Sequence, residues 1–241
     1  MRPGRARRCL LMTDQDEAAE RYRRLADEFP EHFHNPDPEG IVILEGAQRA
    51  EAEAELACRL TAAGQPVSWA RAGVYYEDNW IWLLRDVIRF PGAETGTYHR
   101  VIPKSGNDSA AILPRYRGEL LLVRHFRHGI RMWSLEFPRG SANPLLKPDE
   151  IARIELREEM GVEATALHPL GWIHGQNHIS MVRLHMFLAE VDGPGRTAEA
   201  EGITGIVAVS VERFEEMIKD GEVTDSTTLN LFCLARLRGL L

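Results

Sequence analysis

Cysteine is scarce in this sequence, and long apolar runs are missing from it. The three cysteines, Cys9, Cys58 and Cys233, are far apart and odd in number, so they form neither a disulfide framework nor a cluster of metal ligands. This usage predicts a reducing compartment, and we expect a cytoplasmic location. No apolar run is long enough to cross a bilayer, so we expect no membrane partner.

An excess of positive charge is also missing. Lysine and arginine total 29, aspartate and glutamate total 36, and the formal net charge is −7. Because non-specific binding of nucleic acid needs a basic footprint, this balance argues against a nucleic-acid partner. An acidic chain can still bind a polyanion where divalent cations mediate the contact. The length of 241 residues suits a core domain with an appendage.

Helical patterns with little chemistry fill residues 13–70. Thr13 and Asp14 can cap a helix that runs through residues 18–29, and Pro30 closes it. An Ala/Glu/Leu-rich stretch over residues 47–63 is followed by Gly64, which is typical of a helix end. We therefore predict an N-terminal helical extension over residues 1–70 that serves packing or oligomer contacts.

Aromatic and β-branched residues dominate from residue 71 onward and predict strands. Turn residues separate the first runs, which indicates an antiparallel meander within residues 71–112. The expected strands are 74–76, 80–84, 86–90, 97–102, 119–126, 133–137, 167–173, 182–191 and 205–210. Helices are expected at 148–160, at 211–219 and from Asp225 or Ser226 onward. A sheet with a helix in the middle of its strands suggests an α/β sandwich.

Three glutamates share one face of the predicted helix over residues 148–160. Glu155, Glu158 and Glu159 stand at i, i+3 and i+4, so their carboxylates project together and repel one another. Arg153 and Arg157 could relieve only part of this repulsion. A hard divalent cation with oxygen ligands would turn the cluster into a site. A solvated charged helix face is the alternative.

The spacing around these glutamates resembles the Nudix box, G-x5-E-x7-R-E-U-x-E-E-x-G-U, in which U is aliphatic. The matched positions are Gly140, Glu155, Leu156, Glu158, Glu159, Gly161 and Val162. The resemblance implies a Nudix-type α/β/α sandwich with a mixed sheet, here preceded by the antiparallel meander and the N-terminal helical extension. We therefore expect residues 71–241 to form a Nudix hydrolase domain.

The same resemblance implies a metal site and its ligands. Glu155 and Glu159 would be the main ligands of Mg²⁺, with Mn²⁺ as the alternative cofactor. Glu158 would be an additional ligand or a base, and the backbone carbonyl at Arg139 or Gly140 would complete the coordination.

Two box positions depart from the pattern, because Leu146 replaces its first glutamate and Ile154 replaces its arginine. In the family these two residues are understood to pair as an ion bridge. Loss of one partner of a buried pair costs about 3–5 kcal/mol, whereas exchange of both for apolar groups can be nearly neutral. We interpret Leu146 and Ile154 as the same structural brace in hydrophobic form.

Residues 72–240 also resemble the ADP-ribose pyrophosphatase branch of the Nudix proteins, through the segments LVRHFR (122–127) and WSLEFPRG (133–140). In that branch an acidic loop residue before a late strand helps to activate water, which implies Glu199 or Glu201; a solvated loop glutamate is the alternative. The branch also implies a homodimer whose first strands, here within residues 71–112, are exchanged with the partner.

Five further side chains are candidates for substrate binding. Arg124 and Arg127 could clamp phosphate oxygens or the terminal sugar, but residues three apart on a strand face opposite sides, so at most one should reach the site. Arg139 could add a positive charge beside the metals, with an exposed surface position as the alternative. Glu136 could take a substrate hydroxyl or support other side chains of the site. Trp82 could stack on a base, with packing in a core or dimer as the alternative.

The predicted function is Mg²⁺-dependent hydrolysis of a pyrophosphate bond in a nucleotide-derived small molecule, of ADP-ribose or nucleotide-sugar type, to two phosphate monoesters. The branch usually has a Pro-Gly turn after the strand that follows the box. Here His174-Gly175-Gln176 replaces that turn, which leaves the sugar open. The alternative is a non-catalytic Nudix-fold protein that binds or senses a ligand, and the complete glutamate trio favours the enzyme.

Overall fold

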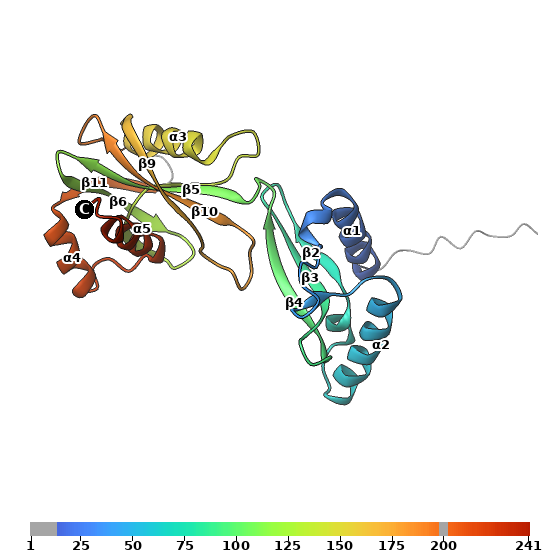
Figure 1. The fold of residues 1–241 in the computed structure, drawn as a ribbon. Coiled ribbons are helices and arrows are strands. Elements are labelled where there is room, and N and C mark those ends of the chain that lie inside the picture. Colours follow the sequence, from blue (N-terminus) through green and yellow to red (C-terminus); the bar gives the residue numbers. More distant parts are fainter. Residues whose placement is uncertain (1–13, 198–201) are drawn as a thin grey trace, which may run out of the picture. The chain divides into compact units, whose positions relative to one another are not determined.

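The computed structural model describes residues 14–197 and 202–241 (Figure 1). The chain forms two compact units, Met1–Lys104 (unit 1) and Ser105–Leu241 (unit 2). The boundary therefore follows the strand meander, whereas the sequence placed it after residue 70. The reason is tertiary packing, because the strands after residue 70 share a core with the N-terminal helices. Within the described residues, no helix is long and apolar enough to cross a membrane.

Unit 1 is a four-stranded antiparallel sheet with helices packed on it. Its helices are α1 (Asp14–Glu28) and α2 (Gly46–Ala62), with the short 3-10 helices η1 (Pro30–His32) and η2 (Val67–Ala70). Its strands are β1 (Val42–Ile43), β2 (Gly73–Glu77), β3 (Ile81–Arg89) and β4 (Thr95–Pro103). β3 pairs with each of the other strands.

Strand β3 unites two segments that the sequence predicted as separate strands. The residue between them is Arg85, which pairs with Gly73 of β2 and with His99 of β4, so the strand continues through it. Asp86, the first residue of the second predicted segment, is buried at 1% exposure and paired with Arg100. Around it, Tyr22 and Leu56 from the helices and Val74 and Leu84 from the sheet belong to one apolar cluster.

Unit 2 is a seven-stranded mixed sheet with helices on both faces. Its strands are β5 (Asp108–Tyr116), β6 (Glu119–Arg127), β7 (Met132–Glu136), β8 (Arg139–Gly140), β9 (Ala164–His174), β10 (Arg183–Val191) and β11 (Ile203–Val209). Its helices are α3 (Pro148–Met160), α4 (Val211–Lys219) and α5 (Ser226–Leu237). The order β11-β6-β5-β10-β9 contains one parallel pair, β5 with β10, beside antiparallel pairs.

Two apolar cores flank this sheet, because side chains alternate between its faces with a period of two. On β6, Leu121 and Val123 join the core under α3, whereas Leu120 and Leu122 join the core under α4 and α5. In Figure 1, α3 lies on one side of the sheet and α4 with α5 on the other. The predicted α/β/α sandwich with a mixed sheet is thereby confirmed.

Strand β5 is central to unit 2, yet the sequence did not predict it. The strand contains Ala110, Ala111 and Pro114, and alanine and proline are both depleted in strands. In the structure, β5 pairs with β10 from Asp108 to Arg115. Burial on both faces of the sheet thus overrides local preference.

Helix α3 spans the residues that its end signals predict. Pro148 is at its first turn, and the Glu150 side chain accepts a hydrogen bond from the Lys147 backbone N–H at 2.7 Å. Gly161 ends the helix at φ 63°, in the left-handed region that favours glycine. These local contacts fix the helix register, and with it the face that carries the glutamates.

Candidate active site

Helix α3 places Glu155 directly against Gly140 of β8. A Cβ atom built on Gly140 would lie 1.9 Å from Oε1 and 2.2 Å from Cγ of Glu155. No heavier side chain fits there unless Glu155 moves. Glycine at position 140 is therefore required by close approach to the carboxylate, not by the backbone conformation.

The three glutamates of α3 line one cavity of about 910 Å³. Glu159 is buried at 8% exposure, Glu155 is half-buried and Glu158 is exposed, so the carboxylates range from the wall to the mouth. Gly140 lines the same cavity. We call this the glutamate cavity; the box spacing brings together the residues that the sequence nominated for metal binding.

The arginines of α3 contact the segment after the helix. Arg153 donates a hydrogen bond to the Ala164 carbonyl at 2.9 Å, and Arg157 lies 3.6 Å from the Glu163 carboxylate. The arginines that line the glutamate cavity come instead from the sheet, namely Arg127 of β6 and Arg139 of β8.

A buried carboxylate, Glu136 at the end of β7, holds these two arginines. It is 1% exposed, and its Oε2 accepts a hydrogen bond from Arg127 Nε at 3.0 Å, with a second bond from Arg127 Nη2 to Oε1. Arg139 Nη2 lies 3.7 Å from Oε2, and His125 Nδ1 lies 3.3 Å from Oε1. Glu136 thus lies beneath the arginines, where it orients their guanidinium groups. This matches the second of its two predicted roles, support of other side chains, and Glu136 does not itself line the glutamate cavity.

Arg139 also links β8 to the beginning of α5. Its Nη2 lies 3.3 Å from Asp225 Oδ1, and its Nη1 donates to Thr227 Oγ1 at 3.0 Å. Asp225 caps α5 by accepting the Thr228 backbone N–H at 2.9 Å. The cap was predictable from the sequence, but its contact with Arg139 was not, because these residues are far apart in the chain.

Two other substrate-binding candidates lie elsewhere. Arg124 faces away from Arg127 across the strand; its guanidinium is 3.9 Å from the Trp133 ring centroid and donates to Thr204 Oγ1 at 3.2 Å. Trp82 belongs to unit 1, where its ring centroid is 5.5 Å from that of Phe29. Neither lines the glutamate cavity.

The remaining predicted residues divide between the cavity and the undescribed segment. Leu146 and Ile154, at the altered box positions, both line the glutamate cavity, and Leu146 also packs on the core under α3. Both positions are therefore apolar parts of the cavity wall, and the hydrophobic brace stays a prediction. Glu199 and Glu201, the candidate bases, lie outside the described residues.

The donor set of the cavity suits a hard divalent cation. Glu155, Glu158 and Glu159 offer carboxylate oxygens, the ligands that Mg²⁺ prefers. Close contact between Glu155 and Gly140 leaves the β8 backbone beside that carboxylate. In residues 14–197 and 202–241, however, no group of three or more His, Cys, Asp or Glu side chains is already converged on a metal position. The residues fit the cation by their chemistry, and binding would require the carboxylates to turn inward.

Comparison with known proteins identifies the family. The NUDIX domain model matches residues 106–231, over half of the chain, so the protein belongs to the Nudix family. No curated protein matches the chain. Among solved structures, the crystal structure of an ADP compounds hydrolase is similar, with a TM-score of 0.61 and 18% identity over 70% of this chain and 93% of that chain. At this identity the likeness shows the fold alone.

Proposed function

We propose that this protein hydrolyses a pyrophosphate bond in a nucleoside diphosphate derivative, with a divalent cation, Mg²⁺ or Mn²⁺, as cofactor. The observation that carries the proposal is that Glu155, Glu158 and Glu159 of the box line one cavity, with Glu155 against Gly140. The similar fold of an ADP compounds hydrolase supports a substrate of this class. A homodimer and a cytoplasmic location remain predictions.

The reaction is the attack of water on one phosphorus of a P–O–P bridge. The bridging P–O bond breaks, and the water oxygen becomes part of one of the two phosphate monoesters. A cation held by Glu155, Glu158 and Glu159 would neutralise charge on the phosphate oxygens and lower the pKa of bound water. Glu199 or Glu201 is proposed to accept the proton of the attacking water.

The arginines from the sheet contribute fixed positive charge. Arg127 and Arg139 line the cavity with guanidinium groups that Glu136 holds in place. Such groups donate charge-assisted hydrogen bonds to phosphate oxygens, and they stabilise charge that builds up during hydrolysis without reorganising. We assign both arginines to the diphosphate of the substrate.

An activity panel tests the proposal. The full-length protein is incubated with Mg²⁺ and ADP-ribose, other nucleotide sugars or dinucleotides, and released monophosphates are separated by chromatography. Glu155→Gln and Glu159→Gln should each lower turnover by about 100-fold or more, the scale on which loss of a charge-stabilising group acts. Glu163→Gln, just after the helix and ion-paired with Arg157, is the matched control and should keep its activity.

Two results of this panel would count against the assignment. Near-normal turnover by Glu159→Gln would show that the glutamate cavity is not the reaction centre. Absence of cleavage of every compound, with nucleotide sugars still bound, would favour the non-catalytic ligand-binding alternative.

A further inference from the structure

His125 of β6 is buried in the wall of the glutamate cavity, although it belongs neither to the box glutamates nor to the arginines assigned to phosphate. The residue is 8% exposed, and it lines the cavity together with Arg127. Its position among the strands and its contacts with charged side chains indicate what it contributes there.

The register of the sheet places His125 between Arg127 and Glu136. On β6, His125 and Arg127 are two residues apart, so both lie on the face of the sheet that carries Val123 and the core under α3. Glu136 of β7 pairs with Val123, which makes it the diagonal neighbour of His125, within reach of an aromatic side chain. Arg127 is four residues from that level, about 13 Å along the strand. Its side chain must therefore lean back past His125 to reach Glu136.

The side-chain contacts agree with this register. Nδ1 of His125 lies 3.3 Å from Oε1 of Glu136, and the Arg127 guanidinium donates to both oxygens of the same carboxylate. A carboxylate held by arginine only accepts hydrogen bonds, so the ring nitrogen that faces it carries the proton. Oε1 of Glu136 is therefore shared between the imidazole N–H and the guanidinium group.

The beginning of β11 packs against another edge of the imidazole. Ile203, which is 1% exposed, pairs with His125 in the register of β11 and β6. The Phe126 backbone N–H donates to the Gly202 carbonyl at 3.0 Å, and a Cβ atom built on Gly202 would lie 3.9 Å from His125 Cδ2. Close packing on this side restricts the ring, so Nδ1 stays beside Glu136.

A fixed orientation of the Glu136 carboxylate matters for Arg127. Bidentate pairing between an arginine and a carboxylate requires the two planar groups to be aligned. Rotation of the carboxylate about its last side-chain bond would break one of the two hydrogen bonds. A further N–H beside Oε1 opposes that rotation, and it thereby keeps the guanidinium group of Arg127 in its place at the cavity wall.

We infer that His125 is a positioning residue: it holds the Glu136 carboxylate, and through this carboxylate it directs Arg127 at the diphosphate of the ligand. The role is indirect, since His125 acts through Glu136 and not on the reacting atoms. The inference rests on the proposed function, in which Arg127 binds the diphosphate.

Two substitutions separate the N–H of His125 from the bulk of its ring. His125→Phe keeps a planar ring without a donor, whereas His125→Asn keeps a donor near Nδ1 with less bulk. With the best substrate of the activity panel, His125→Phe should lower kcat/KM by about fivefold, the effect of one lost hydrogen-bond donor, and His125→Asn by less than about twofold. The Mg²⁺ concentration for half-maximal rate should not change, because the glutamates of α3 are untouched. His125→Leu, which also lacks a donor, takes the place of His125→Phe if that variant does not fold.

A double variant shows whether the effect passes through Glu136. In the Glu136→Gln background, His125→Phe should cause no further loss of kcat/KM, because a residue that acts through another is not additive with it. His128→Phe, an exposed histidine just after β6 that contacts Arg131, is the matched control and should keep the kcat/KM of wild type.

Binding of α,β-methylene ADP, whose P–C–P bridge is not hydrolysed, separates this test from that of the proposed function. Its Kd, measured by calorimetry with Mg²⁺, should rise by about fivefold in His125→Phe and stay near the wild-type value in His125→Asn. This pattern in a wild type that cleaves nothing would overturn hydrolysis and leave His125 as a positioning residue for diphosphate binding.

Three results would overturn the positioning role. Wild-type kcat/KM and Kd in His125→Phe would show that the ring only packs, and an equal loss in His125→Phe and His125→Asn would show that the donor on Glu136 is not what matters. Either result, with cleavage by wild type, leaves the proposed function standing. A wild type that neither cleaves the panel nor binds α,β-methylene ADP would overturn both proposals.

Discussion

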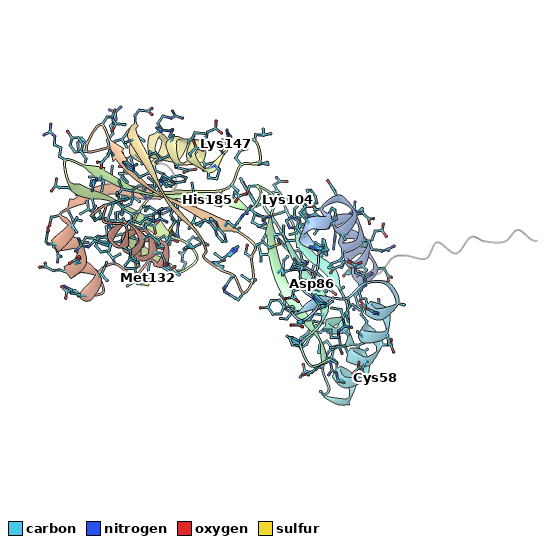
Figure 2. All side chains as sticks on the ribbon, viewed as in Figure 1. Cys58, Asp86, Lys104, Met132, Lys147 and His185 are labelled. Carbon is cyan, nitrogen blue, oxygen red and sulfur yellow. The ribbon has the colours of Figure 1, made fainter. Side chains whose placement is uncertain are left out.

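Each unit of this protein buries a carboxylate beside arginine. In unit 1 this carboxylate is Asp86, which is labelled in Figure 2. Asp86 accepts hydrogen bonds from Arg100 Nε at 2.5 Å, from Arg100 Nη2 at 3.0 Å and from the Tyr22 hydroxyl at 2.6 Å. In unit 2, Glu136 is paired with Arg127 and Arg139. Both carboxylates are 1% exposed, so burial and pairing alone do not distinguish them.

The contacts of the arginines distinguish the two networks. The remaining guanidinium nitrogen of Arg100, Nη1, donates a hydrogen bond to the His32 carbonyl at 2.6 Å. The guanidinium group is therefore bonded entirely within unit 1. Burial, followed by the nearby Asp86 charge, raises the pKa of Tyr22 far above its usual value, which keeps that hydroxyl a donor. Arg127 and Arg139 instead line cavities. A buried ion pair therefore indicates a functional site only where its arginines also line a cavity that contains other groups able to bind a ligand.

The largest combined effect is expected from Glu136→Gln. Removal of the charge leaves Arg127 and Arg139 without their shared partner, which should destabilise unit 2 by about 3–5 kcal/mol. The misplaced guanidinium groups should also lower kcat/KM by about tenfold. Urea unfolding and hydrolysis assays measure the two effects; a stable variant with full activity would remove the distinction between the networks.

Asp86→Asn should destabilise the protein without lowering kcat/KM. The change leaves the Arg100 charge buried beside a neutral amide, at a cost of about 3–5 kcal/mol to the stability of unit 1. Hydrolysis per folded molecule should be unchanged at a temperature below the unfolding transition. A loss of kcat/KM as large as that of Glu136→Gln would mean that the unit 1 network also serves the reaction.

Gly140→Ala should lower kcat/KM without destabilising the protein. The new Cβ would lie 1.9 Å from Glu155 Oε1, so the carboxylate must leave its place. We expect kcat/KM to fall by about 100-fold, equivalent to about 2.7 kcal/mol of transition-state stabilisation, with little change in the thermal transition. Gly205→Ala in β11, where a Cβ meets nothing within 4 Å, is the control. Equal activity of the two variants would refute the role given to the Glu155 contact.

The smallest effect concerns Asp108, whose partners are His185 and Arg183. Burial alone would raise the pKa of its carboxyl, but the hydrogen bonds from His185 and Arg183 outweigh burial and lower it. Its contribution to stability is therefore present at neutral pH and is lost as the pH falls through the folded pKa. Because the carboxylate is 40% exposed, Asp108→Asn should cost below about 1 kcal/mol at pH 7.

The pH dependence of that difference is the check. The free energies of unfolding of wild type and Asp108→Asn, measured in urea, should converge as the pH falls from the ordinary aspartate pKa of about 4 through the lower folded pKa. A difference that grows in acid would contradict the sign of the pKa shift.

Local signals made some elements of the fold predictable and left others unpredicted. The span of α3 follows from Pro148, Glu150 and Gly161, which lie within or beside the helix itself, so its glutamate face was predictable. Strand β5 was not, because its alanines and Pro114 favour no strand until both faces of the sheet are covered. The unit boundary at Lys104 likewise depends on packing between distant segments.

Some parts of the candidate site were likewise predictable from the sequence and others were not. The glutamates and Gly140 form a spaced motif, and their meeting in one cavity follows from the helix and strand that carry them. The contacts of Arg139 with Asp225 and Thr227 join segments that are 86 and 88 residues apart in the printed sequence, and no local pattern indicates such contacts. Residues that hold a site from a distance are thus the ones that sequence analysis missed.

The dependence of hydrolysis on Mg²⁺ concentration, compared between wild type and Glu159→Gln, tests directly whether the box glutamates hold a catalytic cation. We expect wild type to be inactive in EDTA and to be activated in a saturable way by Mg²⁺. Glu159→Gln should be at least about 100-fold slower and should require more Mg²⁺ for half-maximal rate. Equal rates for wild type with and without EDTA, or the same Mg²⁺ dependence in both proteins, would contradict it.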